Sequence, residues 1–202
     1  MGLVLSCIVF QMTRIYTGTG DEGLTGLCNG ARVSKTEYVV EALGQLDLLN
    51  SKIGVCLSNY RDLPLPIKGV LTRAQADLFS CGAIISRAEM NFSEYLINEM
   101  EKNIDFLQEQ LPELKKFILP GGSAPASLLF ELRAMARQTE ISIWKVISFN
   151  SKSSIFRRNE KAQEHLRQSK RIAIYLNRFN DYLFVAARFV NSVNGEAEVT
   201  WN

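Results

Sequence analysis

The sequence predicts an all-α protein built as a five-helix up-down bundle. Five stretches repeat apolar residues at three- and four-residue steps, which is the period of an amphipathic helix. Short segments rich in proline, glycine or polar residues separate them, so consecutive helices are expected to pack antiparallel. The chain has 202 residues, of which 47% are hydrophobic and 22% charged, enough to bury one core without disulfides or a structural metal.

The first two helices are bounded by capping and proline signals. Ser34 is a candidate N-cap for the first helix, with Glu37 placed for a capping box. The pair Pro64 and Pro66 ends that helix and begins a turn. The second helix is expected over residues 67–85.

The remaining three helices follow in the same way. The third is expected over 93–111, with Ser93 as its N-cap. The fourth is expected over 123–147, because Pro125 is tolerated in a first turn. A polar surface loop, 150–159, comes next. The last helix is expected over 160–193.

We expect a single helical domain over residues 14–193. Residues 1–13 form an N-terminal extension that is expected to be disordered or incidental, and 194–202 form a C-terminal tail. No internal repeat and no linker divides the part between them.

Composition excludes several classes of function. Lys and Arg total 23 and Asp and Glu total 21, so the net charge of +2 lacks the basic surplus that a nucleic-acid partner requires. No apolar run approaches the length of a membrane span. The four cysteines are scattered and His165 is the only histidine, so neither a zinc cluster nor a His-centred triad can be assembled. We expect reduced thiols and a cytoplasmic location, or a mitochondrial one if the source is eukaryotic.

Five glycines crowd into the stretch before the first helix, where we therefore expect neither a regular helix nor a packed strand. Backbone N–H groups at glycines and threonine hydroxyls can cradle a polyphosphate, to which Lys35 adds a cation. Asp21 opposes an anion unless it orders the loop or helps to hold a metal ion. A flexible arm is the alternative, because no Gly-Lys-Ser/Thr ends the stretch. The candidate binding residues are Thr17, Gly18, Thr19, Gly20, Asp21, Gly23, Thr25 and Lys35.

A polar face on the fourth helix is formed by Arg133, Arg137, Glu140 and Trp144. Two guanidinium groups one turn apart repel each other, so they need carboxylates or phosphates between them. This face is a candidate for an interface ion pair or a triphosphate clamp. A solvated basic stripe is the alternative.

A second polar face, on the last helix, is formed by Asn177, Asp181, Phe184 and Arg188. Asn and Asp give up helix propensity inside a helix, so a buried hydrogen-bond network or a ligand must compensate, and both interpretations stay open. Asp47 raises the same question in an apolar run of the first helix, because a buried carboxylate there needs a cation such as Arg133 or Arg137.

In this order, these motifs resemble those of the PduO-type family of ATP:cob(I)alamin adenosyltransferases. The resemblance extends from about Arg14 to about Asn191, and several collinear motifs carry it. They are Tyr16-Thr17 with Gly20-Asp21-Glu22-Gly23-Leu24-Thr25, Arg32-Val33-Ser34-Lys35, Asp47-Leu48-Leu49-Asn50-Ser51-Lys52-Ile53-Gly54, Phe117-Ile118-Leu119-Pro120-Gly121-Gly122, and Leu176-Asn177-Arg178-Phe179-Asn180-Asp181-Tyr182-Leu183-Phe184.

The resemblance implies a ferritin-like five-helix bundle that assembles as a homotrimer and binds ATP between adjacent subunits through the Gly-rich loop. It implies transfer of the 5′-deoxyadenosyl group of ATP to the cobalt of cob(I)alamin, which gives adenosylcobalamin and triphosphate. Mg²⁺ would assist at the phosphates, and a reductase is a further partner that could supply the reduced corrinoid.

The resemblance also implies roles for single residues. Arg133 matches the arginine that pairs with Asp47 across the subunit interface, and Arg137 matches the arginine at the ATP phosphates. Asn177 matches an asparagine of the ATP site, and Phe117 matches the aromatic that walls the corrin pocket and disfavours a lower axial ligand on cobalt. Glu140 and Asp181 are counted with the nucleotide-binding residues.

The chain also departs from the family pattern. Gly18, Gln138 and Ile141 stand where the family usually carries basic residues, Leu48 replaces a usual Glu, and Phe130 stands near a frequent His. Fewer cations around a leaving triphosphate weaken its stabilisation. The alternative function is therefore a catalytically weakened homologue that binds ATP or a corrinoid in a regulatory or delivery role.

Overall fold

The computed structural model describes residues 16–152 and 159–201, so the expectations about residues 1–13 and about most of the polar loop lie outside the described part. Within these ranges two short strands precede five helices, which confirms the expected all-α five-helix class with a small hairpin added. The elements are β1 (Leu24–Gly26), β2 (Arg32–Ser34), α1 (Tyr38–Asn59), α2 (Leu65–Ile85), α3 (Glu94–Gln108), α4 (Ala124–Lys152) and α6 (Glu160–Val193).

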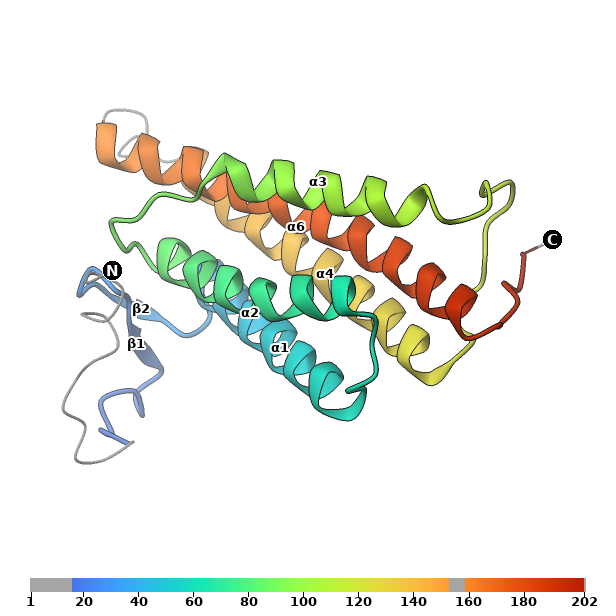
Figure 1. Ribbon diagram of the computed structural model, residues 1–202. Coiled ribbons are helices and arrows are strands. Elements are labelled where there is room, and N and C mark those ends of the chain that lie inside the picture. Colours follow the sequence, from blue (N-terminus) through green and yellow to red (C-terminus); the bar gives the residue numbers. More distant parts are fainter. Residues whose placement is uncertain (1–15, 153–158, 202) are drawn as a thin grey trace.

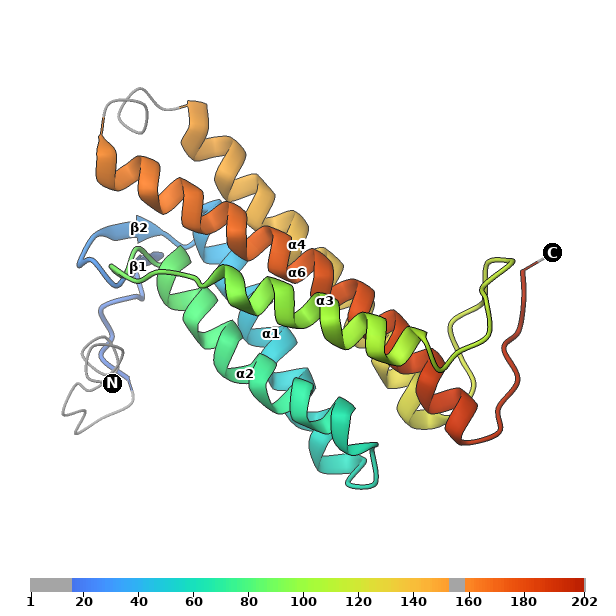
Figure 2. The ribbon, with the colours of Figure 1, turned by 45° about the horizontal axis from the view of Figure 1, so that its top comes forward.

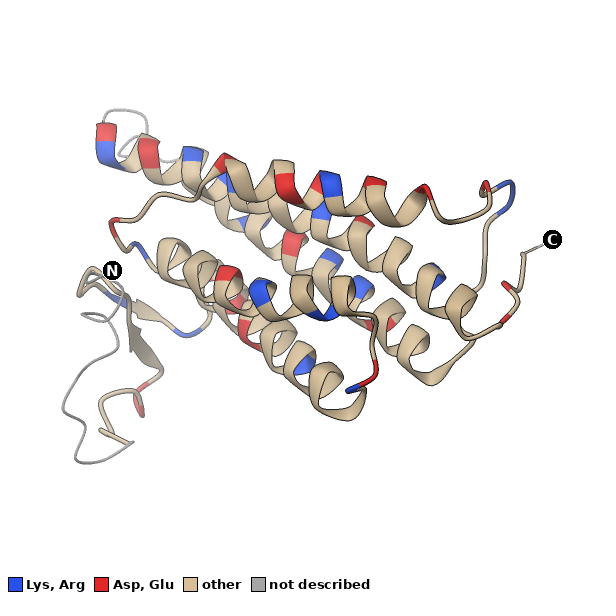
Figure 3. Ribbon diagram, viewed as in Figure 1, with Lys and Arg blue, Asp and Glu red and all other residues tan. Residues whose placement is uncertain are grey.

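Consecutive helices reverse direction along the bundle, so the up-down arrangement is confirmed (Figures 1 and 2). The long helices α4 and α6 form the central pair, with α1 packed on α4, α2 on α1, and α3 on α6. Two ion pairs, Glu94 with Arg171 and Glu101 with Arg178, join α3 to α6. From the first pair to the second, the residue number rises by seven on both helices, so α3 and α6 run parallel. Figure 3 shows acidic and basic residues interspersed along the bundle.

The core is filled by the apolar faces of all five helices. A run of stacked rings from α6 occupies its centre, with centroids 6.3 Å apart between Tyr175 and Phe179 and 6.4 Å apart between Phe179 and Tyr182. Fully buried side chains of this kind contribute about 1.5–3 kcal/mol each. In the described residues, no helix is long and apolar enough to cross a membrane.

A few buried polar contacts fix how the helices sit on one another. Asn50 on α1 and Gln75 on α2 each donate to the backbone carbonyl of the other, at 3.2 and 3.3 Å. The Tyr175 hydroxyl donates to the Asp77 carboxylate at 2.9 Å, which joins α6 to α2. Burial raises the pKa of Asp77, while this hydrogen bond and the charge of Arg73 lower it.

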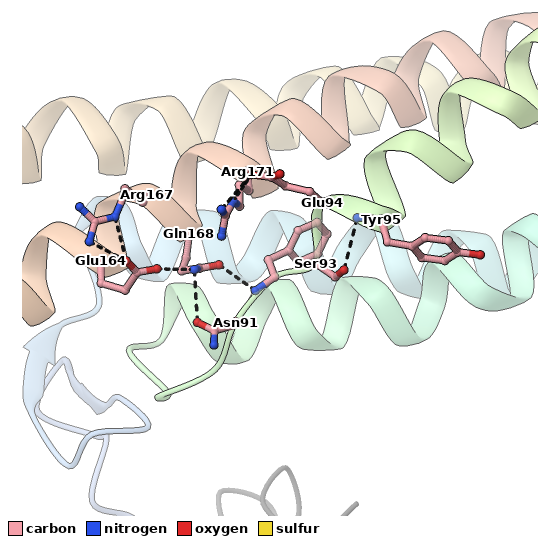
Figure 4. A network of polar contacts seen from close by, with 9 residues as sticks. Asn91, Ser93, Glu94, Tyr95, Glu164, Arg167, Gln168 and Arg171 are labelled. Atoms are coloured by element: carbon pink, nitrogen blue, oxygen red, sulfur yellow. Dashed lines mark hydrogen bonds and ion pairs between the residues drawn. The ribbon is translucent and has the colours of Figure 1, made fainter.

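The connection from α2 to α3 is held against α6 by one buried amide (Figure 4). The Gln168 side chain accepts a hydrogen bond from the backbone N–H of Phe92 at 2.7 Å and donates to Asn91 at 3.3 Å. Ser93 then begins α3, and its hydroxyl accepts from the N–H of Tyr95 at 3.3 Å. The expected N-cap at Ser93 is therefore confirmed.

Three expected boundaries are wrong. The third helix ends at Gln108, three residues before the expected end at Leu111. α1 begins at Tyr38 without a side-chain cap, because Ser34 lies at the end of β2 and its hydroxyl bonds instead to Thr36. The fourth helix continues to Lys152, five residues beyond the expected end at Ile147. The last helix begins and ends as expected, with the Asn159 side chain accepting from the N–H of Ala162.

Candidate functional site

The Gly-rich stretch forms a turn that leads into a β-hairpin. β1 pairs antiparallel with β2, with Thr25 opposite Val33. The stretch nonetheless contains the strand Leu24–Gly26, which was not expected, because pairing with Arg32–Ser34, six to ten residues further along the chain, compensates for the weak strand propensity of glycine. Gly18 and Gly23 adopt φ angles of 69° and 79°, which L-residues rarely do, so the turn depends on glycine there.

The hairpin gathers the expected phosphate-binding residues around one exposed turn. The hydroxyls of Thr17 and Thr19 lie 2.9 Å apart, and the backbone N–H of Lys35 donates to Gly23 at 2.9 Å. A Cβ added at Gly20 would lie 3.2 Å from the Lys35 ammonium nitrogen, so that cation lies against the turn. Arg32, which the sequence analysis did not select, donates from its guanidinium to the Thr19 carbonyl.

The polar faces of the fourth and last helices meet in the fold. The charges of Arg178, Glu140, Arg133 and Arg137 all act on the carboxyl group of Asp181. Burial raises the pKa of Asp181 and Glu140 raises it further, whereas the three arginines lower it, Arg178 most strongly. The two faces that were expected separately meet at Arg133, which lies over the Phe184 ring and lines one cavity together with Asp181.

Arg133 is the partly buried arginine of the polar face on α4. Its guanidinium carbon lies 5.9 Å from the centroid of the Phe184 ring, which packs edge-on against Phe130. Its Nε is buried and has no hydrogen-bond partner among the described residues. Asp47, the expected partner, is exposed on α1 and forms no ion pair with the described part of the same chain.

The neighbouring side chains are held in place by local contacts. Arg178 donates to the Asn177 amide oxygen at 2.9 Å and to Glu101 of α3 at 2.8 Å. Glu140 accepts from the Trp144 indole N–H at 3.1 Å. The Arg137 side chain is exposed.

A cavity of about 850 Å³ opens beside Arg133, between α3, the segment that follows it, and α6. α4 contributes Arg133 to its wall. From α6 come Arg178, Asn180, Asp181, Phe184, Val185 and Arg188. This volume lies within the range of sites that take large organic ligands.

Phe117 lies in the connection between α3 and α4, with 79% of its surface exposed. The C-terminal tail runs beside this connection. The Trp201 N–H donates to the Phe117 carbonyl and the Leu119 N–H to the Val199 carbonyl, both at 2.8 Å. The tail was expected over 194–202, but its pairing with the connection was not, since no local pattern identifies the pairing partner.

The hairpin and the α3–α4 connection, which carries Phe117, lie at opposite ends of the bundle (Figures 1 and 2). The hairpin packs on the end of α2, where the Cys28 N–H donates to the Ser86 carbonyl at 2.9 Å. Phe117 lies near the C-terminus, at the end where α3 stops. A single chain therefore does not bring the Gly-rich turn to Phe117.

The described residues contain no group of three or more His, Cys, Asp or Glu side chains that could hold a metal ion. In the Gly-rich turn, the carboxylates of Asp21 and Glu22 are the oxygen ligands that magnesium could use.

Comparison with known proteins gives concordant matches. A family model described as cobalamin adenosyltransferase matches residues 15–190. The corrinoid adenosyltransferase of Bacillus subtilis (strain 168) is 36% identical over 194 residues, covering 93% of this chain and 92% of the relative. The cobalamin adenosyltransferase of Cupriavidus metallidurans is 34% identical and covers 95% of each.

Solved structures agree with the sequence matches. A variant PduO-type ATP:corrinoid adenosyltransferase from Lactobacillus reuteri, complexed with cobalamin and ATP, is similar with a TM-score of 0.78. It is 29% identical, and the match covers 94% of this chain and 97% of that chain. Another variant of that enzyme, complexed with ATP, gives a TM-score of 0.76.

Proposed function

Because the chain belongs to the cobalamin adenosyltransferase family, we propose that it transfers the 5′-deoxyadenosyl group of ATP to the cobalt of cob(I)alamin and releases triphosphate. The observation that carries this proposal is that Arg133, Arg178 and Asp181 line a cavity of about 850 Å³, while the charge of Arg137 also acts on Asp181. The arginines provide cations for phosphates directly beside a space of the size that a large organic substrate needs.

The chemistry requires no catalytic base. The lone pair of Co(I) attacks the ribose C5′, the Co–C bond forms, and the C5′–O bond breaks with its electron pair moving to the triphosphate oxygen. The protein must align the reactants and stabilise the departing negative charge. Arg137, exposed on α4, is suited to the second task because its guanidinium is available to bond phosphate oxygens.

We assign the Gly-rich turn to the nucleotide. Lys35 and Arg32 both approach it, at Gly20 and at the Thr19 carbonyl, so two cations flank the turn although Gly18 carries none. Magnesium is commonly held by one or two carboxylates together with substrate phosphates, which fits Asp21 beside this turn. When bound with ATP, Mg²⁺ would neutralise part of the phosphate charge.

We assign the cavity and Phe117 to the corrinoid. The exposed Phe117 ring offers an apolar surface to a flat macrocycle, and crowding on one face of cobalt disfavours a lower axial ligand. Phe184 adds a second aromatic ring to the cavity wall.

A homotrimer would complete this site. Tyr38, which follows the hairpin, packs on Phe149 of α4, about 18 Å along that helix from Arg137. A neighbouring copy can instead bring its hairpin to Arg137. Asp47 is exposed, and so are two apolar neighbours on the same helix, Leu48 at 53% and Val55 at 45%. Docking that surface on Arg133 would give the buried guanidinium Nε an acceptor. Light scattering after size exclusion tests the oligomeric state, and a dimer or monomer at working concentration would contradict it.

The substrate must arrive reduced, so we expect a reductase as a transient partner. The buried thiols Cys56 and Cys81 agree with a reducing compartment such as the cytoplasm. Cell fractionation tests this location.

Incubation of the purified protein with ATP, Mg²⁺ and chemically reduced cobalamin tests the activity. Adenosylcobalamin is the expected product, and its rate should fall in Arg137→Ala but not in Arg61→Ala, an exposed arginine in the turn between α1 and α2. No product above the uncatalysed background would remove the proposal. Calorimetric ATP binding with zero turnover would instead favour a binding homologue without catalysis.

A further inference from the structure

The last turns of α6 carry two buried polar side chains that reach across to other segments. Arg188 and Asn191 are each only 4% exposed, and their three-residue spacing places them on one face of the helix. Polar side chains are rarely buried to this extent unless their hydrogen-bonding groups are satisfied. Both are satisfied by the two segments that surround Phe117.

Arg188 joins the C-terminal tail to the beginning of the α3–α4 connection. Its Nε and Nη2 donate to the two carboxylate oxygens of Glu198, at 2.6 and 3.3 Å. Nη2 also donates to the Pro112 carbonyl at 3.0 Å. Side-chain exposure is 5% for Arg188 and 25% for Glu198, so solvent screens this ion pair little.

Asn191 holds the other end of the same connection. Its amide nitrogen donates to the Gly121 carbonyl at 2.9 Å, and its amide oxygen accepts from both the N–H and the hydroxyl of Ser123 at 3.0 Å. Gly122 adopts a φ of 96°, and a Cβ there would overlap the Asn191 amide. The connection is therefore held tightly against α6 at this point.

Between these two points the tail pairs with the connection. Ile118 lies opposite Thr200 in an antiparallel bridge, and the two backbone hydrogen bonds at Phe117 and Leu119 flank it. Gly195, at a φ of 70°, ends α6 and turns the chain back toward the connection. The two segments run side by side at the end of the bundle that carries the C-terminus (Figures 1 and 2).

We propose that Arg188 and Asn191 are positioning residues for the corrinoid reaction, which fix Phe117 through residues 198–201 and the Gly121–Ser123 turn. The proposal rests on the proposed function, in which Phe117 meets the corrin ring. With 79% of its surface exposed, the ring is held little by side-chain packing, so the backbone determines where it stands. A displacement of about 1 Å at such a residue is enough to alter a reaction rate substantially.

A truncation and a point substitution test this proposal. Truncation after Glu196 removes the paired segment completely, and Glu198→Gln keeps the side-chain size but removes the charge that Arg188 binds. Glu196→Gln is the matched control, because Glu196 is exposed and forms no ion pair in the described part of the chain. Glu198→Asp is the conservative variant.

The first measurement needs no substrate. In the parent protein, amide hydrogen exchange at Leu119 and Trp201 should be slow, because both N–H groups are bonded across the two segments. We expect Leu119 exchange to accelerate in the truncated protein and in Glu198→Gln, but not in Glu196→Gln. Unchanged exchange at Leu119 in the truncated protein would show that the tail does not fix the connection, and would overturn the proposal.

The second measurement separates the two substrates. We expect KM for ATP to stay within about twofold in the truncated protein, and KM for cob(I)alamin to rise about ten- to a hundred-fold. In the truncated protein and in Glu198→Gln, the spectral signal of four-coordinate cob(II)alamin bound with ATP should weaken as well. Glu198→Asp should recover part of this signal. If the parent is active and the truncated protein keeps both the parent corrinoid KM and the parent spectrum, the inference fails while the proposed function stands. If the parent itself makes no adenosylcobalamin, the proposed function fails.

Discussion

The two ends of the bundle hold their loops in different ways. At one end, the Gly-rich turn rests on a hairpin of three residue pairs, and the side chains of Thr17, Thr19 and Lys35 are exposed. At the other end, the Phe117 connection is fixed by the buried side chains of Arg188 and Asn191. The polar side chains at the first end are therefore available to a ligand. Those at the second end form hydrogen bonds within the protein.

This difference matches the shapes of the two proposed substrates. A triphosphate chain is flexible and is bound by donors that can adjust to it, so an exposed turn with several N–H groups and cations is suitable. A corrin ring is rigid, and a wall that must crowd one face of its metal has to be in place beforehand. Substitutions around Arg188 and Asn191 should therefore change stability, and those at the exposed side chains proposed to bind phosphate should change catalysis alone.

Arg188→Ala should have the largest effect on stability. It leaves the Glu198 carboxylate without its cation and the Pro112 carbonyl without its donor, and loss of one partner of a buried ion pair costs about 3–5 kcal/mol. Because Glu198 keeps some exposure to solvent, we expect about 3 kcal/mol in the free energy of unfolding. Denaturant unfolding measures it, with Arg61→Ala as the control. Equal denaturation midpoints for the two variants would contradict a stabilising role of the Arg188 contacts.

Two glycines, one at each end, give a direct comparison. Gly122→Ala forces an L-residue to a φ of 96° and pushes its Cβ into the Asn191 amide, so we expect a loss of about 2–3 kcal/mol. Gly26→Ala in β1 meets open space at a φ that L-residues adopt, and its effect should stay within about 0.5 kcal/mol. Thermal unfolding of both variants measures the difference. Similar shifts would show that the two ends are equally rigid.

Arg137→Ala should separate function from stability. Loss of a guanidinium that bonds phosphate is expected to lower kcat/KM for ATP by about 1.5–3 kcal/mol, roughly ten- to a hundred-fold. Its exposed side chain contributes little to folding, so the unfolding midpoint should not move. Steady-state kinetics with ATP varied at saturating cob(I)alamin measures the effect. Parent-like ATP kinetics would refute the assigned role.

The sequence predicted the helices well where local signals were complete. The bounds of α6 and the Ser93 cap followed from periodicity and capping, which act within a few residues. Ser34 was misassigned because the pairing of Thr25 with Val33 joins segments that no local pattern links. Three-residue strands are also too short to show an alternating pattern.

In the candidate site, too, local features were predicted from the sequence and contacts between separate segments were not. Helical spacing identified the faces that carry Arg133 and Asp181, but it could not give the rotation of one helix against the other, on which their meeting depends. The partnership of Arg188 with Glu198 was missed because the tail must first turn back at Gly195. The proposed pairing of Asp47 with Arg133 involves a second chain and remains a prediction.

Asp181→Asn offers the smallest and most specific test of the comparison. Burial raises the pKa of Asp181 in the folded protein, so the ionised carboxylate opposes folding. This unfavourable effect is absent below the pKa of the unfolded chain and develops as the pH rises through the folded pKa. The variant should match the parent near about pH 4 and be slightly more stable near about pH 7, while using ATP less well. Unfolding curves across this pH range measure the difference, with Asp62→Asn in the α1–α2 turn as the control. A loss of stability at neutral pH would place Asp181 among the structural residues instead.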